Sequence, residues 1–185
     1  MIDSLAISSQ LTFVRIRGLM GYFHDASVRH GVPVALLLAI ASRESNMGLN
    51  LDANWTGDNG NGIGMMQIDK RYHADFTSRH ANNDHQANIN YGAQYLSGLI
   101  RQFNGDLNSA VAAYNAGPSR VRSAVSSGLH PDAVTTGRDY GTDVLKRKEL
   151  IKSMIGVSKA SSLSIVMIPM IVAGFASYKF LTHKT

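Results

Sequence analysis

The chain has no cysteine among its 185 residues. This absence excludes a disulfide framework, and it also excludes a zinc site built on thiolates. The hydrophobic fraction of 44% is ordinary, which argues against global disorder. A chain of this length fits one domain with at most a short appendage.

Several common site signatures are also missing. There is no Walker loop, no dinucleotide fingerprint and no Ser/His/Asp signature. The stretch from Asp52 begins like an EF-hand loop, but its twelfth place is Ile63 instead of glutamate. His73, His80 and His85 match no compact zinc spacing. We therefore expect neither a metal nor a cofactor.

The charge balance is mildly basic. Lysine and arginine number 18 against 13 acidic residues, a net charge of +5. This suits an anionic partner such as a cell-wall polymer or a membrane surface. No basic stripe with interleaved aromatic residues is present, so we expect no nucleic-acid binding.

Apolar residues recur at helical spacing through most of the chain. The helix expected from Val34 is apolar nearly all round and should be central. Residues 47–64 are rich in Gly, Asn and Asp and indicate loops, and residues 63–69 have short-strand character, consistent with a small hairpin or three-stranded patch. The predicted helices cover Thr12–His30, Val34–Asn46 and residues 89–103, 107–115, 119–126 and 139–155. The predicted fold class is mainly α (α+β), with one small β element.

The two ends of the chain differ in character. Residues 1–8 have no positively charged region, so we expect no signal peptide. Residues 160–178 carry no charge, and as a helix they would span about 28 Å, close to the roughly 30 Å of a bilayer core. We predict a domain over residues 1–155, then a linker and a C-terminal hydrophobic, transmembrane helix within 156–185, spanning about 160–181. A C-terminal helix packed on the domain is the alternative, although the segment lacks a polar face.

Three carboxyl groups lie around a glycine-rich stretch. Glu44 ends the apolar helix, and Asp58 and Asp69 flank the segment between them. Taken singly, each is an ordinary helix-end or turn residue. Together they could supply the acid and the base that glycoside hydrolysis uses.

Four motifs carry a family resemblance. They are Ser42-Arg43-Glu44-Ser45, the segment from Gly57 to His73 that contains Met65-Met66-Gln67-Ile68-Asp69, Ala113-Tyr114-Asn115-Ala116-Gly117, and Thr135 to Val144. In this order and spacing they resemble goose-type lysozymes, which share their fold with the soluble lytic transglycosylases. The resemblance covers about residues 10–155. Two departures are a Met65 where the family usually has leucine, and a Glu44–Asp58 gap one residue longer than usual.

The resemblance implies a function and its residues. It implies cleavage of the β-1,4 bond between N-acetylmuramic acid and N-acetylglucosamine in peptidoglycan. Glu44 would be the general acid, and Asp58 and Asp69 would activate the attacking water, giving inversion. The implied substrate-binding residues are Ile63, Gln67, His73, Tyr114, Asn115 and Tyr140, with Tyr140 near Glu44.

Two other functions stay open. A lytic transglycosylase would leave a 1,6-anhydro end and needs only one carboxyl group, and the presence of Asp58 and Asp69 favours hydrolysis over this reaction. A membrane-anchored virion or structural protein could instead keep the fold only to bind glycan. Retention of all three carboxyl groups argues against that.

The apolar tail and the lack of a signal peptide suggest a bacteriophage or bacterial wall-lytic protein. We expect anchoring in a host inner membrane or a virion membrane, with action on peptidoglycan in the periplasm or cell wall. Positive residues before the tail would, however, favour a cytoplasmic domain until lysis or entry. These residues are Lys146, Arg147, Lys148, Lys152 and Lys159.

Overall fold

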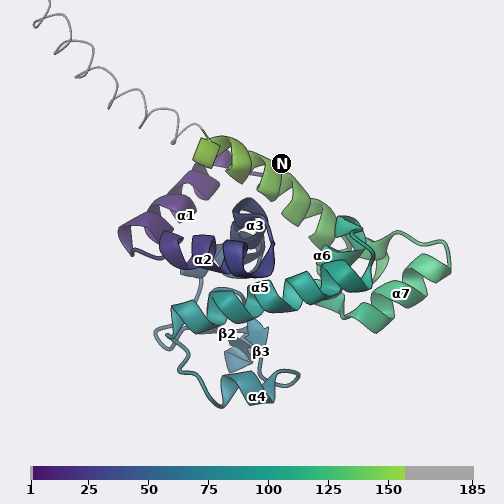
Figure 1. Ribbon diagram of the computed structural model, residues 1–185, viewed down its shortest axis with the longest axis horizontal. Coiled ribbons are helices and arrows are strands. Elements are labelled where there is room, and N and C mark those ends of the chain that lie inside the picture. The colour runs from purple at the N-terminus through teal and green to yellow at the C-terminus, as the bar shows by residue number, and fades with distance from the viewer. Residues whose placement is uncertain (1, 157–185) are drawn as a thin grey trace, which may run out of the picture. The chain divides into compact units, whose positions relative to one another are not determined.

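The computed structural model describes residues 2–156, which form a mainly helical fold with one small sheet (Figure 1). This confirms the expected fold class. The elements are α1 (Ser4–Ile16), α2 (Met20–His30), α3 (Val34–Ser45), β1 (Thr56–Gly57), β2 (Gly62–Ile63), β3 (Ile68–Asp69), α4 (Ala74–Thr77), α5 (His85–Gln102), α6 (Leu107–Ala116), α7 (Pro118–Ser126) and a last helix over residues 140–156. Short 3-10 turns lie at Asn46–Gly48, Asp58–Gly60, Pro131–Val134 and Thr136–Arg138.

The apolar tail is not part of this description. Within residues 2–156, no helix combines the length and apolar character needed to cross a bilayer. The span predicted over about 160–181 lies outside the described residues.

The single helix predicted over Thr12–His30 is in fact two helices. α1 begins eight residues earlier, at Ser4, because the Asp3 carboxylate caps it by accepting from Leu5 N at 2.9 Å. Between α1 and α2, Gly18 adopts a left-handed conformation at φ 70°. A residue in the left-handed conformation commonly ends a helix. The apolar residues keep their helical spacing on both sides of Gly18, so the spacing alone did not reveal the break.

The α3 helix lies in the core, as predicted from its apolar sequence. Leu36, Leu37, Leu38 and Ile40 are fully buried. Truncating one such side chain to alanine typically costs about 2–5 kcal/mol. Because α3 is fixed in the core up to its last turn, Glu44 is held at the edge of a rigid element.

The α5 helix connects the helical part to the sheet. It begins four residues before the predicted start, because Asp84 caps it by accepting from Ala87 N at 3.0 Å. It packs against α2 and α6, and Figure 1 shows it between the α1–α3 group and the strands. One side of α5 thus supports the core and the other supports the sheet.

The three short strands form an antiparallel sheet in the order β1-β2-β3. Their length is too small for stability alone, so α5 supplies a support. The buried Asn88 of α5 donates to Ile63 O at 2.8 Å and accepts from Met66 N at 3.0 Å. Gly64 lies between these contacts at φ 65°, where a Cβ would come within 2.5 Å of Asn88. Between β1 and β2, Thr56 pairs with Ile63 and Gly57 with Gly62. Between β2 and β3, Gly62 pairs with Asp69 and Ile63 with Ile68.

Candidate active site

The serines around Glu44 fix the end of α3. The Ser45 hydroxyl donates to Met65 O at 2.9 Å and accepts from Gly48 N at 2.9 Å. The Ser42 hydroxyl donates to Gln10 Oε1 at 2.6 Å. Both serines are buried, so these bonds replace contacts with water. They hold the helix end against α1 on one side and the sheet connection on the other.

Arg43 ties the same helix end to the start of the last helix. Its guanidinium lies 3.0 Å from Asp139 Oδ1 and 3.5 Å from Asp143 Oδ2. Arg147 pairs with Asp143 at 2.6 Å and donates to Ser42 Oγ at 2.9 Å. This network joins two segments about a hundred residues apart in the chain. Its hydrogen bonds and ion pairs do not involve the Glu44 carboxyl group.

The Glu44 carboxyl group is partly buried and contacts one tyrosine. The hydroxyl of the buried Tyr140 donates to Glu44 Oε1. Burial raises the pKa of Glu44 to about 7, although the hydrogen bond from Tyr140 and the charge of Arg43 oppose the rise. Glu44 therefore holds a proton in a substantial fraction of molecules at neutral pH, as a general acid must.

Glu44 opens into a cleft of about 760 Å³ that also contains both aspartates. Most of the residues expected at the site from the sequence line this cleft: Glu44, Asp58, Gln67, Asp69, His73, Tyr114 and Asn115. Other side chains on its walls had not been expected: Arg71, Tyr72, Tyr95, Arg120 and Thr136. A carboxyl group from a buried helix and two from the sheet region thus share one solvent-filled space.

Asp58 and Asp69 are joined by one arginine. Arg71 Nη2 lies 2.8 Å from Asp58 Oδ2 and 2.6 Å from Asp69 Oδ2. The hydrogen bonds and charge of Arg71 hold the pKa of Asp69 below its usual value despite partial burial. Within residues 2–156, no group of three or more His, Asp or Glu side chains is placed to hold a metal ion. The sequence offered one signal for Arg71, its place two residues after Asp69.

Gln67 and His73 form part of the cleft wall. The Gln67 side chain packs against two glycines of the strands, Gly57 and Gly62. A Cβ atom would lie 2.4 Å from Gln67 Oε1 if placed on Gly57 and 2.2 Å from it if placed on Gly62, so both positions need glycine for this packing. The His73 ring hydrogen-bonds through Nδ1 to the Tyr91 hydroxyl at 2.9 Å. Partial burial lowers the pKa of His73, which favours the neutral ring.

Tyr114 and Asn115 of α6 complete the opposite wall. The Tyr114 hydroxyl donates to Met66 O at 3.0 Å, and burial raises its pKa, so it remains a neutral donor. Asn115 accepts from Thr136 N at 2.8 Å through its side-chain oxygen. That bond orients the Asn115 amide at the cleft wall.

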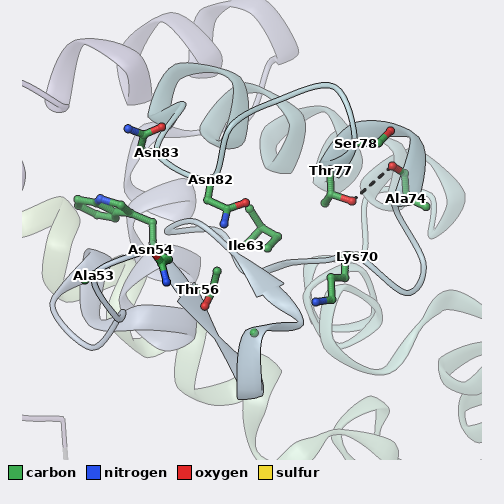
Figure 2. Close-up of a pocket in the computed structure, with 12 residues that line it drawn as sticks. Ala53, Asn54, Thr56, Ile63, Lys70, Ala74, Thr77, Ser78, Asn82 and Asn83 are labelled. Atoms are coloured by element: carbon green, nitrogen blue, oxygen red, sulfur yellow. Dashed lines mark hydrogen bonds between the residues drawn. The ribbon is translucent and has the colours of Figure 1, made fainter.

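Ile63 does not line this cleft, which differs from the expectation for it. Its side chain is 6% exposed and borders a second hollow of about 790 Å³, drawn in Figure 2 with Lys70 and Asn82. The cross-strand partners Gly62 and Asp69 line the cleft that contains Glu44, while their neighbours Ile63 and Lys70 line the second hollow. Ile68, the partner of Ile63 on β3, lines the cleft that contains Glu44, so both spaces border this sheet. Among the described residues that line the second hollow, none carries a carboxyl group.

Comparison with known proteins agrees with these motifs. A family profile described as "Transglycosylase SLT domain" matches residues 21–133. A solved structure of the lytic transglycosylase Slt from Pseudomonas aeruginosa, an inactive mutant, superposes with a TM-score of 0.58 at 24% identity, covering 74% of this chain and 24% of that one. That likeness supports the fold.

Characterised relatives include lysozymes of the g type. Lysozyme G of Dromaius novaehollandiae is 34% identical over 130 residues, covering 65% of this chain and 59% of the relative. Lysozyme g of Epinephelus coioides is 31% identical over 148 residues, covering 72% and 74%. The chain spans less than two thirds of the length of the bird lysozymes that it matches. It belongs to the family of transglycosylase SLT domains and g-type lysozymes.

Proposed function

We propose that this chain is a muramidase that hydrolyses the β-1,4 bond between N-acetylmuramic acid and N-acetylglucosamine in peptidoglycan. The observation that carries the proposal is Glu44, a carboxyl group with a pKa raised to about 7 that faces two aspartates in one cleft. A glycosidase that inverts configuration needs one protonated and one ionised carboxyl group on the two sides of the scissile bond. The differing environments of Glu44 and Asp69 meet that need.

The proposed reaction begins with proton transfer from Glu44 to the glycosidic oxygen as the bond to the anomeric carbon breaks. A water molecule attacks that carbon from the opposite face, and its proton passes to the aspartate pair. Asp69 is ionised over a wide pH range, so it is ready to accept. Exchange of protons with solvent then restores Glu44 and the aspartates.

The cleft composition supports a glycan substrate. Tyr95, Tyr114 and Asn115 line it, and such aromatic and amide groups contact sugar faces and N-acetyl groups. The family relationship points to a peptidoglycan substrate. A net charge of +5 also favours approach to an anionic cell wall.

Mass spectrometry of muropeptides released from purified cell walls tests this proposal. Hydrolysis adds one water to each cleaved bond and yields reducing N-acetylmuramic acid ends, whereas 1,6-anhydro ends as the main product would contradict it. Glu44→Gln is expected to lose nearly all activity while keeping its circular dichroism spectrum. If Glu44→Gln cleaves walls at the normal rate, Glu44 is not the acid.

The second candidate is a lytic transglycosylase. Its support is the description of the matching family profile, together with the engagement of both aspartates by Arg71. That reaction needs only Glu44, which would act as acid and then as base. It predicts anhydro products that persist when Asp58 and Asp69 are both changed to asparagine.

We further propose that the apolar segment over about 160–181 anchors the domain to a host inner membrane or a virion membrane, for use in phage entry or release. The support is the sequence itself, 19 uncharged residues between Lys159 and Lys179. A glycan-binding structural protein on the same anchor is the third candidate. It predicts wall binding by the wild-type chain with no bond cleavage.

A further inference from the structure

Arg71 makes an unusually complete set of contacts with the two aspartates. Its Nε atom lies 2.9 and 3.1 Å from the two carboxylate oxygens of Asp69, and its Nη2 atom lies 2.6 Å from Asp69 Oδ2. The same Nη2 atom lies 2.8 Å from Asp58 Oδ2. The Arg71 guanidinium thus binds the Asp69 carboxylate through two of its nitrogens and also contacts the Asp58 carboxylate through one of them.

The backbone brings these three residues together. Asp69 ends β3, and its carboxylate also accepts from Arg71 N at 2.8 Å. Asp58 lies in the turn between β1 and β2, in a left-handed conformation at φ 49°. Within residues 2–156, this turn is joined to the segment after β3 by the bonds of Arg71 and by one backbone bond, Lys70 N to Asn61 O at 3.0 Å.

We propose that Arg71 is a positioning residue that holds Asp58 and Asp69 as one water-activating unit. The inference deepens the proposed hydrolysis and rests on it. The two Oδ2 atoms share one nitrogen at 2.6 and 2.8 Å, so they lie at most the sum of these, about 5.4 Å, apart. Two carboxylates that close repel each other, and without a cation one would tend to take up a proton.

The charge balance of this unit suits a base. Two carboxylates and one guanidinium carry a net charge of −1, and the unit becomes neutral when it takes the proton of the attacking water. The guanidinium is already protonated and has no acceptor, and Asp69 and Asp58 raise its pKa further, so it stays protonated and cannot take that proton. The proton therefore goes to a carboxylate oxygen, while the water oxygen bonds to the anomeric carbon.

A purely structural role for these ion pairs is small. The Arg71 and Asp58 side chains are 53% and 57% exposed, and the Asp69 side chain is 25% exposed. Exposed ion pairs contribute little to folding because water and salt screen them. Losing Arg71 should therefore change catalysis far more than stability.

The titratable or charged side chains that share the cleft with Asp58, Asp69 and Arg71 are Glu44, Tyr72, His73, Tyr95, Tyr114 and Arg120. Tyr72 lies beside the Arg71 guanidinium, and His73 adds to the field at Asp69. Glu44 lies in the same cleft and governs the alkaline side of the pH profile. The acidic side of the profile is therefore the one that reports on Arg71.

The test compares full-length Arg71→Gln and Arg71→Lys with the wild-type chain. For Arg71→Gln we expect kcat to fall about 10- to 100-fold with KM changed less than about threefold, and the acidic limb of the kcat profile to move up by about one pH unit. Arg71→Lys keeps the positive charge but lacks the two-point hydrogen bonding of a guanidinium. It should therefore bring the acidic limb close to its wild-type position while kcat stays below the wild-type value. Arg79→Gln, which removes an exposed pair with Asp75, is the matched control and should change neither.

Asp58→Asn separates this proposal from the proposed function. It should lower kcat in the wild-type background and add little in the Arg71→Gln background, because the two changes disrupt one unit. Unchanged kcat and acidic limb in Arg71→Gln, with Asp69→Asn inactive, would overturn the role of Arg71 and leave hydrolysis standing. Wild-type rates for both Asp58→Asn and Asp69→Asn would overturn the aspartate mechanism itself. If Arg71→Gln does not fold, Arg71→Lys decides on the same readouts.

Discussion

At the scale of single residues, the environment of Glu44 decides its chemistry. An exposed glutamate ionises near pH 4.5 and would hold no proton at neutral pH. Partial burial at the end of α3 reverses that, and Tyr140 limits how far the pKa rises. At neutral pH, Glu44 is therefore present in both its protonated and its ionised form, and a change at Tyr140 should shift the balance between them.

Tyr140→Phe removes the hydrogen bond that lowers the pKa of Glu44. We expect the alkaline limb of the kcat/KM profile to move to higher pH by on the order of one unit, because the ionised carboxylate loses a donor. Wall-clearing rates measured from pH 4 to 10 check this. Tyr22→Phe on α2, outside the cleft, is the control, and an alkaline limb that stays in place would contradict the assignment.

Glu44 should also make folding stability depend on pH. Its pKa is higher in the folded chain than in the unfolded chain, so full stability is present below about pH 4.5 and is lost as the pH rises through about 7. A shift from 4.5 to about 7 corresponds to on the order of 3 kcal/mol. Glu44→Gln should therefore be more stable than the wild type at pH 8 and similar at pH 4.5. Urea unfolding at both values checks this, and an equal difference at both would contradict it.

At the scale of elements, a capping interaction positions Tyr140, the hydrogen-bond partner of Glu44. The start of the last helix is held by Asp132, which accepts from Gly141 N at 2.6 Å and from Thr142 N at 2.9 Å. Tyr140 lies immediately before these residues, so the cap also places its hydroxyl at Glu44. Asp132 is buried, which makes its replacement more costly than that of an exposed cap.

Asp132→Ala should lower the free energy of unfolding by about 2 kcal/mol or more, because two backbone donors lose their acceptor in a buried site. Asp106→Ala provides the control, since Asp106 is an exposed cap of α6 that accepts from Asn108 N at 3.1 Å. It should cost about 1 kcal/mol or less. Chemical denaturation gives both values, and equal losses would show that burial of the cap has no effect.

The glycines of the sheet region differ in what they tolerate. Gly64→Ala places a Cβ within 2.5 Å of the buried Asn88 at φ 65°, so we expect a loss on the order of 3 kcal/mol and lower activity. Gly60→Ala has a similar φ of 83° but nothing within 4 Å, so it should cost about 1 kcal/mol. Thermal unfolding of the two variants tests the difference. Similar losses would mean that backbone strain alone, and not the contact with Asn88, sets the cost.

At the scale of the whole molecule, the central question is where the domain acts. The apolar span over about 160–181 predicts membrane attachment. We expect the full-length chain to stay in the membrane pellet after carbonate extraction. Replacing Ile168 and Val172 by lysine should release it, because two charges in the bilayer core are costly.

Replacing the exposed Val125 and Leu129 by lysine adds the same charges to the folded domain and serves as the control. This variant should remain in the pellet with the wild type. Release of the wild-type chain into the supernatant would contradict the anchor.

The sequence predicted the helical core and the three carboxyl groups well, for different reasons. Apolar spacing identifies α3 and α5 because burial requires one apolar face. It did not locate the break at Gly18 or the short α4, since both depend on local backbone geometry. Ile63 was expected on the cleft through the family resemblance, and the folded chain places it at the second hollow instead.

What the sequence determined by itself is the set of motifs, the carboxyl groups and the family to which they belong. Only the tertiary structure decided which groups meet. The contact between Tyr140 and Glu44 joins positions 96 residues apart. Arg71 connects Asp58, in the turn between β1 and β2, with Asp69 at the end of β3. Burial shifts the pKa of Glu44 and charge pairing shifts that of Asp69, and both effects depend on the folded neighbours instead of the order of residues along the chain.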